Sequence, residues 1–425
     1  MIRVKIIFIA FLTVTTLTIS AQKKLRTPEQ MAKATTFRSI DEAKLNKKRV
    51  YILNLDNQQL NSVPEEIRDF RNIQELYLRT NNIAFLPDWI FELTNLQKLM
   101  LGENNIQALQ PEIGNLIYLE ELDVFDNELL TLPGEIGSLT LLRKIDANWN
   151  KLETIPEEIG QLKSLTALYL EKNQLTILPG SIGNCTEIAE LKLFSNKLTE
   201  LPASIGKLNK ITELNFSENQ LASLPSEISQ LVNLKVLNLR NNQISGLPDD
   251  LSSLKNLETL DISGNKLKSV AKSTFSLPAL KELDLSSNQL SSIPLQASEL
   301  PSLTKLEMEN NRISNPSPAF TLISLESLNL SRNRIERIEN DIVALKNLKY
   351  LNLSHNALYS VTKSIGELKS LETLDMSYNK IRLLQREIGG MQNLKDLYLE
   401  KNDISDYQRK NIKKYVPSQT KVHFQ

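Results

Sequence analysis

The feature that most constrains this chain is a sequence repeat with a period of 23 residues. One asparagine per unit keeps this spacing, except for a single step of 22 residues. The recurring residues are Asn81, Asn104, Asn127, Asn150, Asn173, Asn196, Asn219, Asn242, Asn265, Asn288, Asn311, Asn333, Asn356, Asn379 and Asn402. Gln58 holds the same place one period before Asn81, which gives 16 units. Such a repeat predicts an elongated array in which each unit contacts only its neighbours.

Each unit contains the pattern LxxLxLxxNxL, as in the segment from Leu165 to Leu175. Alternate side chains of a strand point to opposite faces, so we expect Leu168 and Leu170 to point inward and Tyr169 outward. One unit buries too little apolar surface to fold alone, and its neighbours must stack to complete a core. The 75 leucines among 425 residues therefore predict one continuous core along the array.

The other half of each unit reads LPxxIGxLxxL, as in the segment that contains Pro156 and Gly160. Proline fixes φ and lacks a backbone donor, which suits an extended convex segment outside the sheet. Glycine permits a tight turn, so we expect one before the next strand at five positions. These positions are Gly114, Gly137, Gly160, Gly183 and Gly206.

Both halves of the repeat resemble the leucine-rich-repeat family over about residues 50–404. The LPxxIGxLxxL half is similar to exported bacterial repeat proteins and to the Ras-regulatory and plant disease-resistance repeats. The resemblance implies an α/β repeat solenoid, a right-handed curved horseshoe with a concave parallel β-sheet. Extended, 3-10 and short helical segments would form its convex face. It also implies that the asparagine amides form a hydrogen-bonded ladder, from which Gln58 departs. The proline is replaced in later units by Ala271, Glu339, Thr362 and Gln385.

The first 21 residues have the three-part layout of a secretory signal. Arg3 and Lys5 precede an apolar run over residues 6–12, and small residues lead to a cleavage point near Ala21. We therefore expect a secreted, periplasmic or cell-surface protein without stable membrane insertion. An uncleaved anchor is the alternative, although the apolar run is short.

The two ends of the array need covers, because an open sheet edge and exposed core leucines promote aggregation. Residues 22–49 are expected to form an N-terminal helical cap, with a helix start at Thr27–Glu29. Residues 405–425 are expected to form a C-terminal cap. Within it, the spacing predicts a helix over 405–416 and a closing strand over 422–424.

Composition argues against several classes of function. The chain has 50 Lys+Arg and 50 Asp+Glu, and this zero net charge disfavours nucleic acid or an anionic membrane as a partner. A single cysteine and two histidines offer little for catalysis or metal binding, and no cofactor is expected. Cys185 falls at a leucine position and is interpreted as a small buried residue. His355 is interpreted as a surface residue.

Asp123 and Asp146 occupy equivalent places in adjacent units, so their carboxylates are expected about 5 Å apart. Such a pair is a candidate cation site or coupled acid pair. Asp261 and Asp284 form the same pairing in a region without other notable residues. This favours the interpretation that such acid pairs are a by-product of the repeat. The metal and enzyme hypotheses are therefore kept only as alternatives.

The 22-residue unit contains the segment Asn315–Pro318, with two prolines. It marks either a bend in the solenoid or a harmless deletion in a surface loop.

The solvent-facing strand positions differ between the two halves of the array. Units 8 to 15 carry mostly Asn, Asp and Ser there, whereas units 2 to 7 carry large and charged side chains. The latter, which we call the aromatic band, are Tyr77, Arg79, Met100, Phe125, Asn148, Trp149, Tyr169, Glu171, Lys192 and Phe194. With strands about 4.8 Å apart, the band extends roughly 25 Å. Aromatic, Met and Arg side chains on a rigid surface are typical of protein interfaces.

These observations favour an exported, non-enzymatic, monomeric binding protein that captures a protein partner, from a host or the envelope, on the aromatic band. A glycan that stacks on the aromatic rings is one alternative. Another is a structural spacer, whose exposed aromatic residues merely fit strands well.

Overall fold

The computed structural model describes residues 25–270, 275–295, 298 and 300–424. The signal segment predicted over residues 1–21 lies outside the described residues. Among these residues, no helix is long and apolar enough to cross a membrane.

The described chain builds an 18-stranded parallel sheet, with one strand from each unit. Its strands are β1 (Thr36–Phe37), β2 (Ile52–Asn54), β3 (Glu75–Tyr77), β4 (Lys98–Met100), β5 (Glu121–Asp123), β6 (Lys144–Asp146), β7 (Ala167–Tyr169), β8 (Glu190–Lys192), β9 (Glu213–Asn215), β10 (Val236–Asn238), β11 (Thr259–Asp261), β12 (Glu282–Asp284), β13 (Lys305–Glu307), β14 (Ser327–Asn329), β16 (Tyr350–Asn352), β18 (Thr373–Asp375), β19 (Asp396–Tyr398) and β20 (Lys421–His423). Leu168 pairs with Leu191, one period later, and the same register recurs along the sheet. A second sheet of two short strands joins β15 (Arg337–Ile338) to β17 (Ser360–Val361).

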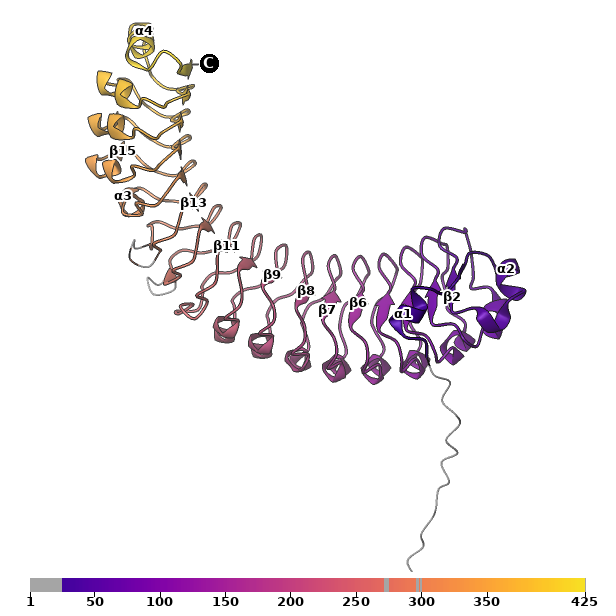
Figure 1. The fold of residues 1–425 in the computed structure, drawn as a ribbon. Coiled ribbons are helices and arrows are strands. Elements are labelled where there is room, and N and C mark those ends of the chain that lie inside the picture. The colour runs from indigo at the N-terminus through magenta and orange to yellow at the C-terminus, as the bar shows by residue number, and fades with distance from the viewer. Residues whose placement is uncertain (1–24, 271–274, 296–297, 299, 425) are drawn as a thin grey trace, which may run out of the picture.

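Most convex segments contain a 3-10 helix of five residues. The 3-10 helices are η1 (Lys47–Arg49), η2 (Glu65–Asp69), η3 (Asp88–Glu92), η4 (Pro111–Asn115), η5 (Gly134–Ser138), η6 (Glu157–Gln161), η7 (Gly180–Asn184), η8 (Ala203–Lys207), η9 (Ser226–Gln230), η11 (Asn340–Ala344), η12 (Lys363–Glu367) and η13 (Arg386–Gly390). The α-helices are α1 (Pro28–Met31), α2 (Ile40–Lys44), α3 (Ser317–Phe320) and α4 (Asp406–Tyr415). Figure 1 shows the sheet on the inner side of an arc and the 3-10 helices on its outer side. The predicted curved solenoid is confirmed.

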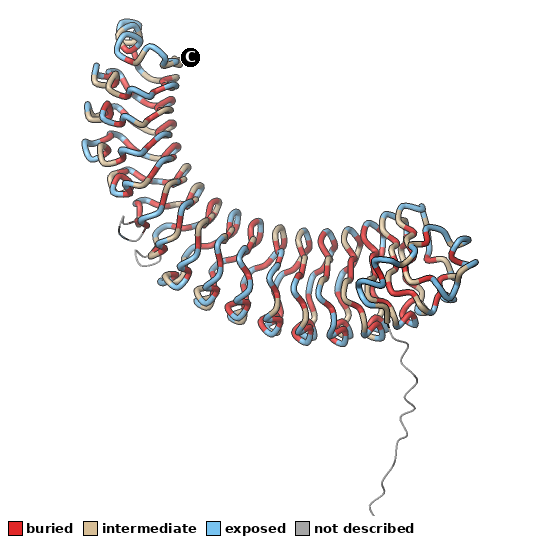
Figure 2. The backbone as a smooth tube through the Cα atoms, viewed as in Figure 1, coloured by how far each residue is buried: buried red, intermediate tan, exposed pale blue. Residues whose placement is uncertain are grey.

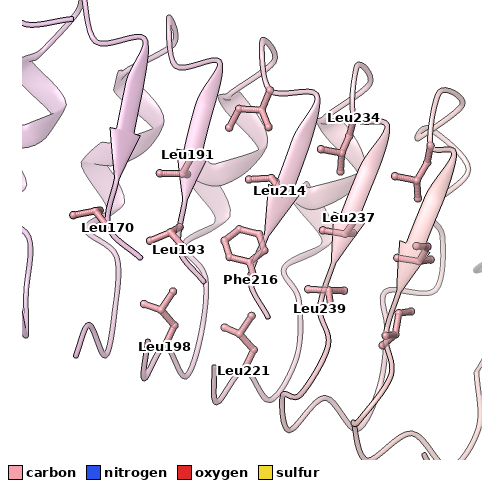
Figure 3. Close-up of a cluster of buried hydrophobic side chains, with 14 of the residues drawn as sticks. Leu170, Leu191, Leu193, Leu198, Leu214, Phe216, Leu221, Leu234, Leu237 and Leu239 are labelled. Carbon is pink, nitrogen blue, oxygen red and sulfur yellow. The ribbon is translucent and has the colours of Figure 1, made fainter. Parts of the chain in front are cut away.

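The core runs as one column between the sheet and the convex segments, and buried residues recur in each coil of Figure 2. In Figure 3, Leu191 and Leu193 point inward from one unit and meet Leu214 and Phe216 of the next. All four side chains are 2% exposed or less. The inward direction predicted for Leu168 and Leu170 is confirmed, since both are fully buried.

The asparagine ladder ties each turn to the unit before it. Asn173 accepts a hydrogen bond from Leu152 N–H at 2.9 Å and donates to the Ala147 carbonyl at 2.9 Å, both in the preceding unit. It also donates to the carbonyls of Leu170 and Glu171 in its own unit, at 3.2 Å each. The amide thereby satisfies buried backbone groups that no strand or helix pairs.

A left-handed residue precedes every ladder position. Its φ ranges from 48° at Asp126 to 66° at Gly264, and the other residues with this conformation include Trp149 and His355. This backbone conformation costs about 1 kcal/mol or more for a residue with a Cβ. The strand can therefore end in such a turn only because the asparagine amide holds it.

Gln58 departs from the ladder as expected. Its longer side chain donates to the carbonyl of Arg38 at 2.7 Å, in the N-terminal segment. Its own backbone N–H donates to Asn81 Oδ1 at 3.0 Å. The backbone of the first unit is thus bonded by the ladder asparagine of the second unit, whereas the Gln58 side chain bonds to the N-terminal segment.

The role predicted for the convex glycines is wrong. Gly183 and its equivalents lie inside or beside the 3-10 helices and have no positive φ, so no turn requires them there. A Cβ on Gly183 would lie 2.4 Å from the Ser204 carbonyl oxygen, and one on Gly206 would lie 2.3 Å from that of Glu227. Glycine is needed at these two positions because a backbone carbonyl of the next unit lies where the Cβ would be, which leaves no room for a methyl group.

The short unit leaves the sheet unbroken. Leu306 pairs with Leu328 across its 22 residues, and Asn333 makes the usual ladder contacts with Met308, Leu330 and Ile313. The missing residue is absorbed on the convex side, where α3 stands in place of a 3-10 helix. The deletion is therefore accommodated locally, outside the strands.

Both ends extend the sheet. At the N-terminus, β1 pairs with β2, a strand that the sequence pattern did not predict. At the C-terminus, the predicted helix is present as α4, and β20 pairs with β19 as the predicted closing strand.

We predict that Asn173→Ala lowers the free energy of unfolding by about 1–3 kcal/mol, because it leaves Leu152 N–H buried without its partner and leaves the Ala147 carbonyl with only the longer bond from Asn150, at 3.3 Å. Urea denaturation followed by circular dichroism measures this change. Gln58→Ala, at the exposed end, is the control and should cost less. Equal costs would contradict the role of the ladder.

We predict that Gly183→Ala destabilises the protein by about 1–3 kcal/mol through overpacking. Gly180 lies in the same 3-10 helix η7, and a Cβ there would meet nothing within 4 Å. Gly180→Ala should therefore be neutral or stabilise by a few tenths of a kcal/mol. Thermal unfolding of the two variants tests the pair, and equal melting temperatures would refute the close-packing explanation.

Candidate binding face

The aromatic band occupies the consecutive strands β3 to β8 and the turns that follow them. Tyr77, Met100, Asp123, Asp146 and Tyr169 end successive strands and pair in register, so they form one row across the sheet. The structure thus brings the predicted site residues together on one side of the array, although it gives them different surroundings.

Tyr169 lies at the centre of a charged cluster. Lys144 Nζ lies 4.9 Å and Lys192 Nζ 4.4 Å from the centroid of its ring, within the range of cation–π attraction. Its hydroxyl donates to the carboxylate of Glu190. Burial, followed by this hydrogen bond to the charged carboxylate, raises the pKa of Tyr169 to about 12. The phenol therefore remains a neutral donor at physiological pH.

Trp149 projects from the left-handed turn after β6. Its φ is 56°, and 48% of the residue is exposed to solvent. Lys172, at the equivalent position of the next unit, places Nζ 3.9 Å from the centroid of the indole ring. The turn that the ladder imposes thus presents a large aromatic side chain beside a cation.

Arg79 reaches across a whole unit. Its guanidinium forms an ion pair with Asp123, which lies 44 residues further along the chain and whose side chain is 8% exposed. Gly102 lies between them, where a Cβ would come within 3.1 Å of Asp123 Oδ1. Since glycine leaves this space open, the ion pair can bridge two units. The repeat pattern does not predict this contact, because it joins residues that are not in adjacent units.

Two of the predicted residues are buried. Met100 is 7% exposed and Asn148 is 8% exposed. Asn148 Oδ1 accepts a hydrogen bond from the backbone N–H of Glu171 at 2.6 Å. Phe125 and Phe194 are partly exposed. The accessible contact area of the band therefore comes from its other members, which are exposed or partly exposed.

A hollow of about 440 Å³ adjoins the band over β8 to β10. Small side chains, including Ala189 and Thr212, leave this space, and Glu190 and Lys192 lie at the side next to Tyr169. Val236 adds an apolar surface at the far side. Val236 is not among the predicted site residues, because its apolar side chain stands out only by comparison with the polar residues around it.

The polar positions of the later units satisfy each other. Ser263 donates through both its N–H and its hydroxyl to Asp261 Oδ1, at 2.8 and 2.6 Å. The Ser377–Asp375 and Ser354–Asn352 pairs repeat this arrangement. Because these side chains already bond to each other at the strand ends, they leave fewer hydrogen-bonding atoms free for a partner than the number of polar residues suggests.

The acid pair is partly neutralised. The ion pair with Arg79 and the hydrogen bond from Phe125 N–H occupy the carboxylate of Asp123. Burial, aided by the nearby charge of Asp123, raises the pKa of Asp146. Within the described part of the chain, no group of three or more His, Cys, Asp and Glu side chains is arranged to hold a metal ion.

Cys185 is fully buried, and its thiol contacts the Ile159 carbonyl at 3.1 Å. Burial raises its pKa to about 11, so the unreactive thiol state dominates near neutral pH. His355 stacks on Tyr378 with ring centroids 4.1 Å apart. Neither residue is part of the aromatic band.

A parallel sheet repeated unit by unit, an asparagine ladder and an open inner face together define the class of leucine-rich-repeat solenoids. The family model described as leucine rich repeat matches residues 186–244, 255–313 and 315–358, and that described as leucine-rich repeat region matches 43–150. A solved leucine-rich-repeat protein of Leptospira interrogans is 36% identical, with a TM-score of 0.77, and the match covers 92% of this chain and 100% of that one. The chain therefore belongs to the leucine-rich-repeat family. Proteins of this family are generally non-enzymatic scaffolds for protein interaction.

More distant structures share the fold. The plant peptide hormone receptor RGFR1, solved in complex with RGF2, is 31% identical with a TM-score of 0.70. That match covers 86% of this chain and 65% of the receptor, so this chain spans less than two thirds of the receptor's length. The Drosophila Toll–Spatzle complex is similar at 23% identity and a TM-score of 0.68, over 87% of this chain and 51% of that one, which shows the fold alone. No curated protein matches the sequence.

We predict that Asp146→Asn stabilises the protein at neutral pH. Because the pKa of Asp146 is raised in the folded state, folding stability falls as pH rises from the ordinary value of 3.8 through the raised pKa. The stability lost through ionisation of Asp146 is still missing at neutral pH. Asparagine avoids this loss because its side chain stays uncharged, and it keeps an oxygen that can accept from Asn148 N–H. Urea denaturation at several pH values tests this, and a variant that is less stable at neutral pH would contradict it.

Proposed function

We propose that this protein is an exported binding protein that captures a protein partner on the aromatic band of its concave face. The main observation behind this proposal is that two aromatic rings stand on adjacent units of a rigid sheet. Trp149 lies beside Lys172, and Tyr169 lies beside Lys144 and Lys192. A hollow adjoins the band on the side of Tyr169. Aromatic side chains supply much of the energy of protein interfaces, and a preformed surface limits the entropy lost on binding.

The charged groups of the band favour a protein over a glycan. Lys144 and Lys192 lie near the ring of Tyr169, and Lys172 lies over that of Trp149. Each lysine competes with a sugar for the ring face. The same lysines, with Glu171 and Glu190, form a mixed-charge surround of the kind that selects protein partners.

Export is part of the proposal. It is supported by the signal-like layout of residues 1–21, with Arg3 and Lys5 before an apolar run. It also agrees with the similarity to the plant peptide hormone receptor RGFR1. The mature chain would then be secreted, periplasmic or located at the cell surface.

The test compares residues 22–425 with a variant in which Tyr77, Phe125, Trp149, Tyr169 and Phe194 are changed to Ser. Both are used to capture partners from secreted, envelope and host-surface fractions, after circular dichroism shows that they fold. We expect the parent to retain a partner that the variant loses, with affinity lowered at least about 100-fold, since several interface anchors are removed together.

The matched control changes five exposed apolar residues outside the strands of the concave sheet. These are Phe85, Ile177, Ile323, Tyr359 and Leu383, each at least 49% exposed. Their change to Ser should leave binding intact. A partner lost equally by both variants, or kept by both, would place the site elsewhere. Capture of nothing by the parent would favour the spacer, and loss of binding after glycosidase treatment would favour a glycan.

A further inference from the structure

The C-terminal end of the array carries a concentrated positive charge. Residues 405–424 hold five cations, Arg409, Lys410, Lys413, Lys414 and Lys421, against the single carboxylate of Asp406, for a net charge of +4. The whole chain is neutral, with 50 charges of each sign. The chain average therefore conceals a basic end, which we call the basic cap.

Within the described residues, the cations of the basic cap have no carboxylate partner, unlike many others in the array. Elsewhere, lysines bond to a glutamate exactly one period before them, as Lys395 does with Glu372 at 2.5 Å and Lys349 with Glu326 at 2.7 Å. Among the residues that the structure describes, none of the five cap cations forms an ion pair. Their charge is available to an external anion.

A groove of about 600 Å³ opens between α4 and β20 within the basic cap. Arg409, Lys410 and Lys413 line it from the helix, together with the carboxylate of Asp406. Val422, His423 and Phe424 line it from the closing segment. Arg409 and Lys413 lie 5.5 and 5.8 Å from the centroid of the Phe424 ring, which holds both cations at the groove. The groove thus combines positive charge with an apolar wall.

The outward face of α4 adds an aromatic residue to this charge. Tyr407, Lys410 and Lys414 are spaced by three and four residues, so they lie on one face of the helix. Ile412 is fully buried on the opposite side. Tyr407 is 72% exposed, and tyrosine beside lysine is typical of surfaces that meet lipid headgroups. In Figure 1, α4 lies at the tip of the arc, where a flat surface can approach it.

We propose that the basic cap attaches the protein peripherally to an anionic phospholipid surface, with headgroup phosphates in the groove between α4 and β20. The attachment is independent of the function proposed for the aromatic band. Since each cation near an anionic surface strengthens binding about five-fold, five cations give a reversible, salt-sensitive attachment. The concave face would remain free for its own partner.

The experiment measures binding of residues 22–425 to vesicles by sedimentation. Vesicles of phosphatidylglycerol mixed with phosphatidylcholine are compared with vesicles of phosphatidylcholine alone. We expect binding to the anionic vesicles only, with loss at high salt. The variant Lys410→Glu/Lys413→Glu/Lys414→Glu should bind at least about ten-fold more weakly, after circular dichroism shows that it folds.

The matched control reverses three exposed convex lysines, Lys207, Lys255 and Lys346, and changes the net charge by the same amount. It should bind as the parent does. Equal loss in the control, equal binding to neutral vesicles, or no effect of the cap reversal would overturn the proposal. Binding to polyphosphate or single-stranded DNA without binding to anionic vesicles would also overturn it, and would assign the groove to a soluble polyanion. Because these readouts do not involve the aromatic band, their failure leaves the proposed protein-binding function untouched.

Discussion

The amide of the ladder asparagine is the interaction on which the rest of the structure depends. It ends each strand in a left-handed turn, an unfavourable conformation for residues such as Trp149 and Tyr378. It also joins that turn to backbone groups of the preceding unit, as Asn173 does with Leu152 and Ala147. Local conformation and stacking are therefore fixed by one side chain. A shorter or charged side chain could not supply both an acceptor and two donors in the same plane.

Close packing on the convex side sets the second constraint. The backbone carbonyl of one unit fills the space where a Cβ of Gly183 or Gly206 would lie. Backbone groups approach closely there, whereas the strands on the inner side are separated by ordinary sheet hydrogen bonds. The one-residue deletion before Asn333 falls on this convex side and leaves the strand register in phase. The convex segments thus tolerate a change in length that the strands would not, because only the strands share a continuous hydrogen-bonded register.

The rigid inner face gives the array its capacity for binding. Each unit contributes the same backbone, so differences between units are differences of side chain alone. Units 8 to 15 use many of these positions for serine bonded to aspartate or asparagine, as Ser263 is to Asp261. The band around Tyr169 instead presents an aromatic ring and the charged side chains of Lys144 and Lys192. A surface of fixed geometry and varied chemistry is suited to recognition of a macromolecule and ill suited to a reaction that requires a closed site.

The strict period predicted the stacked array, the strand positions and the inward leucines, because it makes every unit meet an identical neighbour. The resemblance to the leucine-rich-repeat family implied the curved sheet and the asparagine ladder. The sequence also located the aromatic band, since alternation along LxL assigns each residue to a face. Tertiary structure decided which of those residues are accessible: Asn148 is bonded to Glu171 N–H, and Arg79 is paired with Asp123 two units away. It also showed that Gly183 serves close packing, that β1 extends the sheet, and that a groove in the basic cap is lined by three of its cations. These features depend on distances between units or on the non-repeating ends, where periodicity carries no information.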